Sequence, residues 1–261
     1  MLIKRQLLPV ALFLAVAVGS GCTQSDKGSI GRSCAQGEKT YVIVHGAWGG
    51  GWGFKELDAI LTAAGHKVYR PTLTGQGERV HLASTNIDLE THITDVVNLI
   101  IWEELRDVVL VGHSYGGMVI TGVADRVPDR IAHLVYLDAF VPEHGESVGA
   151  IRGTIGGQPV VTNGFVIPHW VKDGDPIPHD VPHPAQTLLQ PITLTNQAAA
   201  RAIPTTYILT VDEGAKPEQD GFYPFYMRAV ERGWKTQVMV ADHNPQRSKP
   251  RELAELLLKL Q

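Results

Sequence analysis

The sequence predicts an α/β protein with a mostly parallel β-sheet covered by helices on both faces. Short apolar or β-branched runs alternate with longer helix-like stretches along most of the chain. Such alternation is typical of parallel strands that are connected by helices. Runs such as 134–137 are apolar at every position, as expected for strands that are buried on both faces.

The expected elements follow one another along 39–261, which is long enough for one such domain. Strands are expected at 39–44, 67–69, 108–111, 131–137, 207–211 and 237–240. Helices are expected at about 54–64, 89–104, 116–127, 222–232 and 251–260. Between about 142 and 200 the alternation stops, and Pro, Gly and His dominate. We expect this segment to be a lid inserted over the functional end of the sheet.

The first residues have the features of an export signal. Lys4 and Arg5 precede the apolar stretch 7–18, and small residues follow it. The stretch is too short to span a bilayer comfortably as a permanent helix. We therefore expect a signal peptide at 1–21, a flexible tether at 22–38, and a protein that is exported from a bacterial cytoplasm to the periplasm, the medium or a membrane.

Two cysteines, Cys22 and Cys34, both precede the expected domain, so neither is a plausible nucleophile. Cys22 resembles a bacterial lipoprotein processing site, where the cysteine is lipidated and attaches the protein to a membrane. Such sites usually carry Leu where this chain has Gly19. The alternative is ordinary signal cleavage near Ser20 or Gly21, followed by a disulfide between the two cysteines in an oxidising compartment.

The charge pattern argues against nucleic acid as a partner. The net charge is −4 at pH 7, and the sequence has no Lys/Arg-rich run and no phosphate-loop signature. We expect neither a metal nor a cofactor, and the sequence leaves the oligomeric state open.

Ser114 is the expected nucleophile. It lies in Gly-His-Ser-Tyr-Gly-Gly at 112–117, between an expected strand and an expected helix. The pattern Gly-x-Ser-x-Gly alone is weak in a chain with 27 glycines, and its position between strand and helix gives it weight. There the turn lifts the hydroxyl clear of the sheet, and the helix N-terminus favours negative charge.

A serine hydroxyl needs a base, and a neutral histidine suits this role. Functional groups of a parallel sheet gather at the carboxyl ends of its strands. His243 follows the last expected strand and is therefore the expected base. His113 and His45 also follow strands, but one adjoins Ser114 in the turn and the other lies in a glycine-rich loop, which favours packing or hydrogen-bonding roles.

The base needs a carboxylate on its other ring nitrogen. Asp212 follows the strand 207–211 and keeps the chain order Ser, acid, His, so it is the expected acid. Glu213, the next residue, is the nearest rival candidate for the acid. Asp138, after the strand 131–137, remains an alternative because a neighbouring strand end can reach the same histidine.

Two backbone N–H groups are needed for the oxyanion of a tetrahedral intermediate. Ala47, in the glycine-rich loop after the first strand, and Tyr115, directly after Ser114, are in the expected places. Four aromatic residues are candidates for binding an apolar substrate, or else belong to the core of the lid: Trp48, Phe140, Phe165 and Trp170.

The chain resembles the α/β-hydrolase superfamily, and within it the plant-type methylesterase and hydroxynitrile lyase group with its bacterial esterase relatives. The resemblance covers about 39–261 and is carried by the segments 45–48, 64–68, 111–118 and 137–142. It implies a sheet of about six strands, and by position it assigns the nucleophile to Ser114, the acid to Asp212, the base to His243 and the oxyanion donors to Ala47 and Tyr115.

The resemblance also separates two activities of that group. Its lyases carry threonine where this chain has Gly46 and lysine where it has Asn244. Without that ammonium group nothing obvious holds a cyanide leaving group. We therefore expect a serine esterase that cleaves small, largely apolar carboxylic esters through an acyl-enzyme. The alternatives are a non-catalytic protein that binds a small molecule, a lyase-like activity and a cofactor-free haloperoxidase-like activity.

Overall fold

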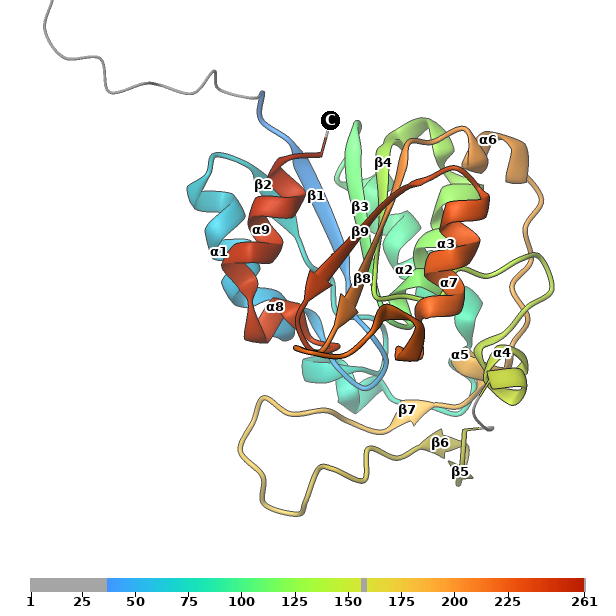
Figure 1. Cartoon of the computed structure of the whole chain (residues 1–261). Coiled ribbons are helices and arrows are strands. Elements are labelled where there is room, and N and C mark those ends of the chain that lie inside the picture. The colour runs from blue at the N-terminus through green and yellow to red at the C-terminus, as the bar shows by residue number, and fades with distance from the viewer. Residues whose placement is uncertain (1–36, 156–158, 261) are drawn as a thin grey trace, which may run out of the picture. The chain divides into compact units, whose positions relative to one another are not determined.

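A six-stranded parallel sheet forms the centre of the computed structural model, which describes residues 37–155 and 159–260 (Figure 1). Its strands are β1 (Thr40–Val44), β2 (Lys67–Tyr69), β3 (Val108–His113), β4 (Ile131–Leu137), β8 (Thr205–Val211) and β9 (Lys235–Val240). Their order is β2-β1-β3-β4-β8-β9, and every neighbouring pair is parallel. The predicted fold class is confirmed, and each predicted strand lies within about two residues of its expected position.

Helices cover both faces of this sheet (Figure 1). One face is covered by α1 (Lys55–Ala63), α8 (Pro245–Ser248) and α9 (Pro250–Leu258), and the other by α2 (Leu89–Trp102), α3 (Gly116–Arg126) and α7 (Tyr223–Glu231). Side chains of β1 alternate between the two layers, because Tyr41 and Ile43 join one buried cluster while Val42 and Val44 join the other. This double burial explains the continuous apolar runs.

Helix starts follow local sequence signals. Asp88 caps α2, since its side chain accepts a hydrogen bond from the Thr91 backbone N–H at 2.8 Å. Proline lies in the first turn of α7, α8 and α9, where its missing N–H is not needed. Short 3-10 segments complete the connections: η1 (Gly51–Phe54), η2 (Gly77–Leu82), η3 (Pro128–Arg130) and η4 (Pro217–Gln219).

In its described residues, the segment between β4 and β8 contains only short elements. They are α4 (Val148–Ile155), β5 (Val161–Thr162), β6 (Phe165–Val166), β7 (His183–Pro184), α5 (Gln186–Leu189) and α6 (Gln197–Arg201). Strands β5, β6 and β7 form a small antiparallel sheet. In Figure 1 this sheet lies beyond the ends toward which the strands of the large sheet point, which is where parallel α/β folds place their sites.

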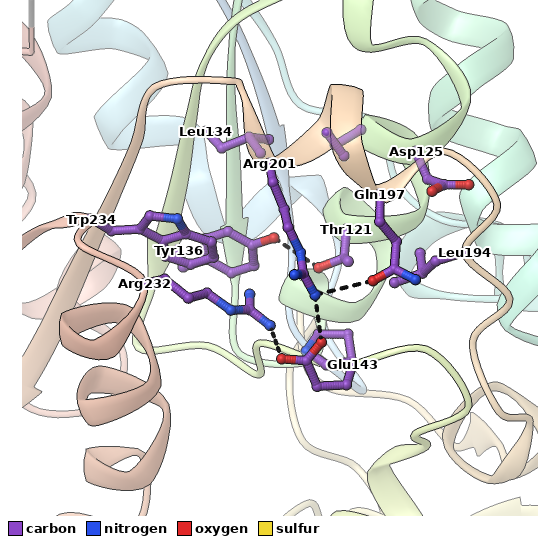
Figure 2. A pocket seen from close by; sticks show the side chains of 13 residues that line it. Thr121, Asp125, Leu134, Tyr136, Glu143, Leu194, Gln197, Arg201, Arg232 and Trp234 are labelled. Atoms are coloured by element: carbon purple, nitrogen blue, oxygen red, sulfur yellow. Dashed lines mark hydrogen bonds and ion pairs between the residues drawn. The ribbon is translucent and has the colours of Figure 1, made fainter.

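Ion pairs fasten the first part of this segment to α7. Glu143 pairs with Arg201 of α6 at 3.0 Å and with Arg232 just after α7 (Figure 2). Glu146 pairs with Arg228 of α7 at 2.7 Å, and Arg228 also donates to the Val141 carbonyl at 2.6 Å. The cavity drawn in Figure 2 has a volume of about 40 Å³. It is too small for an organic substrate.

Several predictions about the N-terminus fall outside the described residues. The chain divides into the units Met1–Gly37 and Glu38–Gln261. The expected signal peptide at 1–21 and nearly all of the tether, with Cys22 and Cys34, precede residue 37. Among the residues that the structure describes, no helix has both the length and the apolar character needed to cross a membrane.

Candidate active site

Ser114 stands at the apex of the turn between β3 and α3. Its φ of +54° lies in the left-handed region, which a non-glycine residue seldom adopts and which is strained. The glycines around it allow the tight packing that holds this turn. A Cβ at Gly112 would lie 2.7 Å from the Gly116 carbonyl oxygen, and one at Gly116 would lie 2.6 Å from the Val44 carbonyl oxygen.

His243 lies within hydrogen-bond distance of this serine. Its Nε2 is 3.0 Å from Ser114 Oγ, and its loop follows β9 at the same end of the sheet. The ring stacks on Phe222, with 4.9 Å between centroids and 12° between planes. The His243 carbonyl also contacts His113 Nε2 at 2.7 Å. The structure therefore brings the expected nucleophile and the expected base together and fixes the ring of the base.

The carboxylate on the other side of His243 is Asp138, not the expected Asp212. His243 Nδ1 lies 2.6 Å from Asp138 Oδ2. Because a carboxylate only accepts hydrogen bonds, Nδ1 carries the proton and Nε2 is left to accept one from Ser114. Asp212 follows the adjacent strand β8, but it is exposed to solvent and begins the turn that contains Gly214. The prediction from chain order was therefore wrong about which strand end supplies the acid.

Backbone geometry explains why Asp138 reaches the histidine. Its φ of +45° turns the chain at the end of β4, and its N–H donates to the Ile208 carbonyl of β8 at 2.7 Å. The carboxylate is only 1% exposed. Its second oxygen, Oδ1, accepts from the Thr210 N–H at 3.1 Å. Burying a carboxylate is costly unless it is hydrogen-bonded, and here both oxygens have a partner.

The charge of Asp138 affects neighbouring groups. Burial raises the pKa of Asp220, and the negative charge of Asp138 adds to this effect. Burial also raises the pKa of Tyr207 well above its ordinary value, again with a contribution from Asp138. The Tyr207 hydroxyl donates to the Ala139 carbonyl at 2.9 Å and accepts from the Ala139 N–H at 3.1 Å. A neutral tyrosine therefore holds the residue directly after the acid.

The expected oxyanion donors flank Ser114. Ala47 follows β1, Tyr115 follows the serine, and both border the same cavity as Ser114. Within the described residues neither backbone N–H donates a hydrogen bond to the protein. Both donors are therefore available to a substrate oxygen.

Trp48, next to Ala47, is held in place by the segment between β4 and β8. Its φ is +64°. Its N–H contacts His183 Nδ1 at 3.2 Å, its carbonyl accepts from the Val181 N–H at 2.9 Å, and its indole N–H donates to the Val166 carbonyl at 2.9 Å. The loop that carries Ala47 and Trp48 therefore depends on that segment for its shape.

Several histidines near Ser114 are buried and neutral. Burial lowers the pKa of His45 and of His92 to about 4, and it lowers the pKa of His113 and His183 well below the ordinary value. His45 Nε2 accepts from the Leu73 N–H at 3.0 Å, so its Nδ1 donates to the Gly46 carbonyl at 2.7 Å. These histidines serve as structural hydrogen-bonding groups, unlike the half-buried His243.

Two cavities border Ser114 and His243. The first, which we call the apolar cavity, has a volume of about 490 Å³ and is lined mainly by apolar side chains. Trp48, Phe140 and Trp170 line it as expected. Phe165 does not line it, whereas its neighbour Val166 does, because successive side chains of a strand point to opposite faces. The second, which we call the polar cavity, measures about 410 Å³.

Sequence reasoning missed three further residues of the site. Phe222, which stacks on the base, stands just before α7. Asp180 and Arg247 line the polar cavity, one from the irregular segment before β7 and the other from α8. The position of Arg247, shortly after His243, was the one sequence feature that could have indicated a role in the site. Nothing in the sequence around 180 distinguishes Asp180 from an ordinary loop carboxylate.

The fold and this geometry agree with the comparisons with known proteins. The model of the Alpha/beta hydrolase family matches residues 41–256. The chain belongs to this family. A carbendazim hydrolyzing esterase of a Nocardioides species is 62% identical over 111 residues, which cover 42% of this chain and 46% of that protein. Salicylic acid-binding protein 2 of Nicotiana tabacum is 35% identical over 108 residues, 40% of this chain and 41% of that protein.

The solved structures extend the similarity over the domain. An extracellular alpha/beta-hydrolase from a Paenibacillus species aligns with a TM-score of 0.64 and 26% identity, over 85% of this chain and 98% of that one. The curated relatives are matched over less than half of their own length. The resemblance to the methylesterase group is confirmed, and it includes methylesterase 2 of Arabidopsis thaliana at 32% identity over 114 residues, 40% of each chain.

Proposed function

We propose that this protein is a serine esterase that cleaves carboxylic esters through an acyl-enzyme. One observation carries the proposal: Ser114 Oγ, the His243 ring and the Asp138 carboxylate form a continuous chain with distances of 3.0 and 2.6 Å. This chain opens onto an apolar cavity of about 490 Å³. The arrangement has the geometry of a nucleophile, a base and an orienting acid. Relatives that are named as esterases support it.

The geometry allows each step of such a reaction. His243 Nε2 takes the proton of Ser114 Oγ as the oxygen attacks the ester carbonyl. Asp138 stabilises the imidazolium that forms, and the Ala47 and Tyr115 N–H groups receive the oxyanion. The intermediate collapses when His243 returns the proton to the departing alcohol. Water then attacks the acyl-enzyme by the same route and releases the acid.

The apolar cavity favours an aromatic or alkyl group on the substrate. Trp48, Phe140 and Trp170 line it, together with Phe222, which also stacks on the base. A cavity of this volume suits a small organic ester. Carbendazim and the methyl esters of aromatic acids, suggested by the names of the relatives, belong in the first substrate panel.

Covalent labelling and turnover test the proposal together. The purified 38–261 unit is expected to hydrolyse short nitrophenyl esters and to bind a fluorophosphonate covalently at Ser114. A Ser114→Ala variant with unchanged thermal stability serves as the control and should lose both properties. A parent protein that neither turns over any ester of the panel nor becomes labelled would refute the esterase. Tight binding of a panel ester without turnover would favour a binding protein on the same fold.

A further inference from the structure

The polar cavity borders the same Ser114 and His243 as the apolar cavity, but the mechanism above uses none of its charged groups. Its volume is about 410 Å³, and it shares Ala47, Trp48 and Trp170 with the apolar cavity. The rings of the two tryptophans meet edge to face at 5.2 Å. A substituent in the polar cavity would therefore lie beside the reacting bond, on the other side of these rings from the apolar group.

Asp180 presents one unsatisfied carboxylate oxygen to this cavity. Its Oδ2 accepts from the Trp170 indole N–H at 2.8 Å. Its Oδ1 is 3.7 Å from Arg247 Nη2, which is too far for a hydrogen bond. The side chain is 19% exposed and lines the cavity, so this oxygen can be reached from there. This oxygen is suited to accept a hydrogen bond from a bound group.

Arg247 supplies donors beside Asp180, with its Nη2 3.7 Å from Asp180 Oδ1. Its guanidinium lies over the Trp52 ring at 4.5 Å from the centroid, which fixes its plane. Within the part of the chain that the structure describes, the guanidinium donates no hydrogen bond to the protein. Its N–H groups are therefore available to an acceptor on a ligand.

Gln246 forms part of the wall of the polar cavity. It lines the polar cavity and is 3% exposed. Its Nε2 donates to Asn244 Oδ1 at 3.1 Å, whereas its buried Oε1 has no hydrogen-bond partner among the described residues. This atom is fully buried, so a group in the cavity does not reach it. Gln246 therefore shapes the cavity wall, and the polar contacts to a ligand fall to Asp180 and Arg247.

We propose that the polar cavity binds a neutral, planar substituent of the ester that carries N–H donors next to an acceptor, as in ureas, amides, carbamates and amino-azoles. Asp180 would accept from its N–H groups, and Arg247 would donate to its acceptor. Asp180 and Arg247 together carry no net charge, which favours a neutral substituent. An anionic substituent would be repelled by Asp180, and a cationic one by Arg247. This inference rests on the proposed ester hydrolysis.

A matched pair of substrates tests the proposal: methyl para-ureidobenzoate and methyl para-isobutylbenzoate, whose substituents have the same size and branching. The measured quantity is the ratio of kcat/KM for the ureido ester to that for the isobutyl ester. Asp180→Asn and Arg247→Met should each lower this ratio by about 10- to 100-fold, the usual effect of losing a hydrogen bond to a charged group. If one of these variants does not fold, the other still tests the proposal.

Asp175→Asn provides the control, because Asp175 is an exposed carboxylate of the same segment that accepts from the Lys172 N–H at 2.8 Å and does not line the cavity. It should leave the ratio unchanged. A ratio that moves less than twofold in both test variants would overturn the proposal. So would a parent enzyme that prefers a para-carboxylate or para-guanidino ester to the ureido ester.

A second readout keeps failure of the esterase distinct from failure of the subsite. If the parent hydrolyses neither ester, turnover of the wider ester panel and labelling of Ser114 decide about the proposed function, and calorimetry with phenylurea on the Ser114→Ala protein decides about the cavity. Binding that disappears when Asp180→Asn is added supports the subsite. No binding, or binding that the second substitution leaves unaltered, overturns it.

Discussion

Replacing Asp138 with asparagine tests which aspartate orients the base. The substitution keeps the size of the side chain but exchanges one oxygen for an NH₂ group. The Thr210 N–H, 3.1 Å from Oδ1, still needs an acceptor. The amide oxygen therefore turns toward Thr210, and the NH₂ group faces His243 Nδ1.

This arrangement forces the wrong tautomer on His243. An NH₂ group that donates to Nδ1 leaves the ring proton on Nε2, so Nε2 no longer accepts the proton of Ser114, 3.0 Å away. A comparable change in a serine protease lowers kcat by about 10⁴. At about 1.4 kcal/mol per factor of ten, this is a rise of about 5 kcal/mol in the barrier. We expect a loss of this size for Asp138→Asn.

Asp212→Asn is the matched control, because Asp212 is exposed and follows the neighbouring strand. It should change kcat by no more than about twofold, as is usual for a surface substitution. Steady-state hydrolysis of one nitrophenyl ester measures both variants, and thermal unfolding confirms that both are folded. If Asp212→Asn is the more damaging of two folded variants, the assignment of the acid to Asp138 is wrong.

Three further perturbations follow from the same contacts. Ser114→Ala and His243→Ala should each lower kcat by about 10⁴ to 10⁶, and the double variant little further, since the residues act as a unit; additive losses in a rate assay would contradict this. Gly117→Ala places a Cβ 2.1 Å from a backbone carbonyl oxygen and should cost about 1–3 kcal/mol of unfolding free energy. Gly221→Ala, with no atom within 4 Å of the added Cβ, should change the melting temperature little. Burial lowers the pKa of His92 to about 4 from its ordinary 6.5. Because the unfolded chain binds the proton first, stability should fall between about pH 6.5 and 4, by up to about 3 kcal/mol for this residue. Urea unfolding at the two pH values measures the loss, and equal midpoints would contradict it.

The sheet was predictable because strands that are buried on both faces leave a strong signal. Continuous apolar runs such as that of β4 have few other interpretations in a chain of this length. The turn around Ser114 was equally predictable from the sequence. Glycine is required at 112 and 116, because a Cβ there would lie only 2.7 and 2.6 Å from backbone carbonyl oxygens. Local sequence therefore determined the position of the nucleophile.

The choice between Asp138 and Asp212 as the acid could not be predicted from the sequence, because the decisive interactions are not local. Asp138 and Asp212 both follow strands, and β4 and β8 are neighbours in the sheet. The left-handed φ of Asp138 and its hydrogen bond from Thr210 select between them. Both depend on how β4 pairs with β8, which apolar patterning does not encode. Chain order, the one available guide, favoured the wrong residue.

The polar cavity could not be predicted from the sequence either, because its residues come from distant parts of the chain. Asp180 comes from an irregular stretch and Arg247 from the helix after the base, so only the folded chain brings them to within 3.7 Å. Phe165 shows the opposite error, because an aromatic residue in a short strand points away from the cavity that its neighbour lines. Over so short a strand, composition alone does not reveal which face is buried.

The segment between β4 and β8 supports two parts of the site, the chain that leaves Asp138 and the loop that carries Ala47. Near its start, Arg228 binds Glu146. Arg232 binds Glu143, as Figure 2 shows. These two ion pairs fix the chain that leaves Asp138. Near β7, its backbone and His183 hold Trp48 beside the oxyanion donor Ala47. Changes in its cavity-lining side chains can therefore alter the substrate while these backbone contacts persist. Loosening its attachment would disturb the loop of Ala47 and Trp48 even if Ser114 and His243, in the turns after β3 and β9, kept their positions.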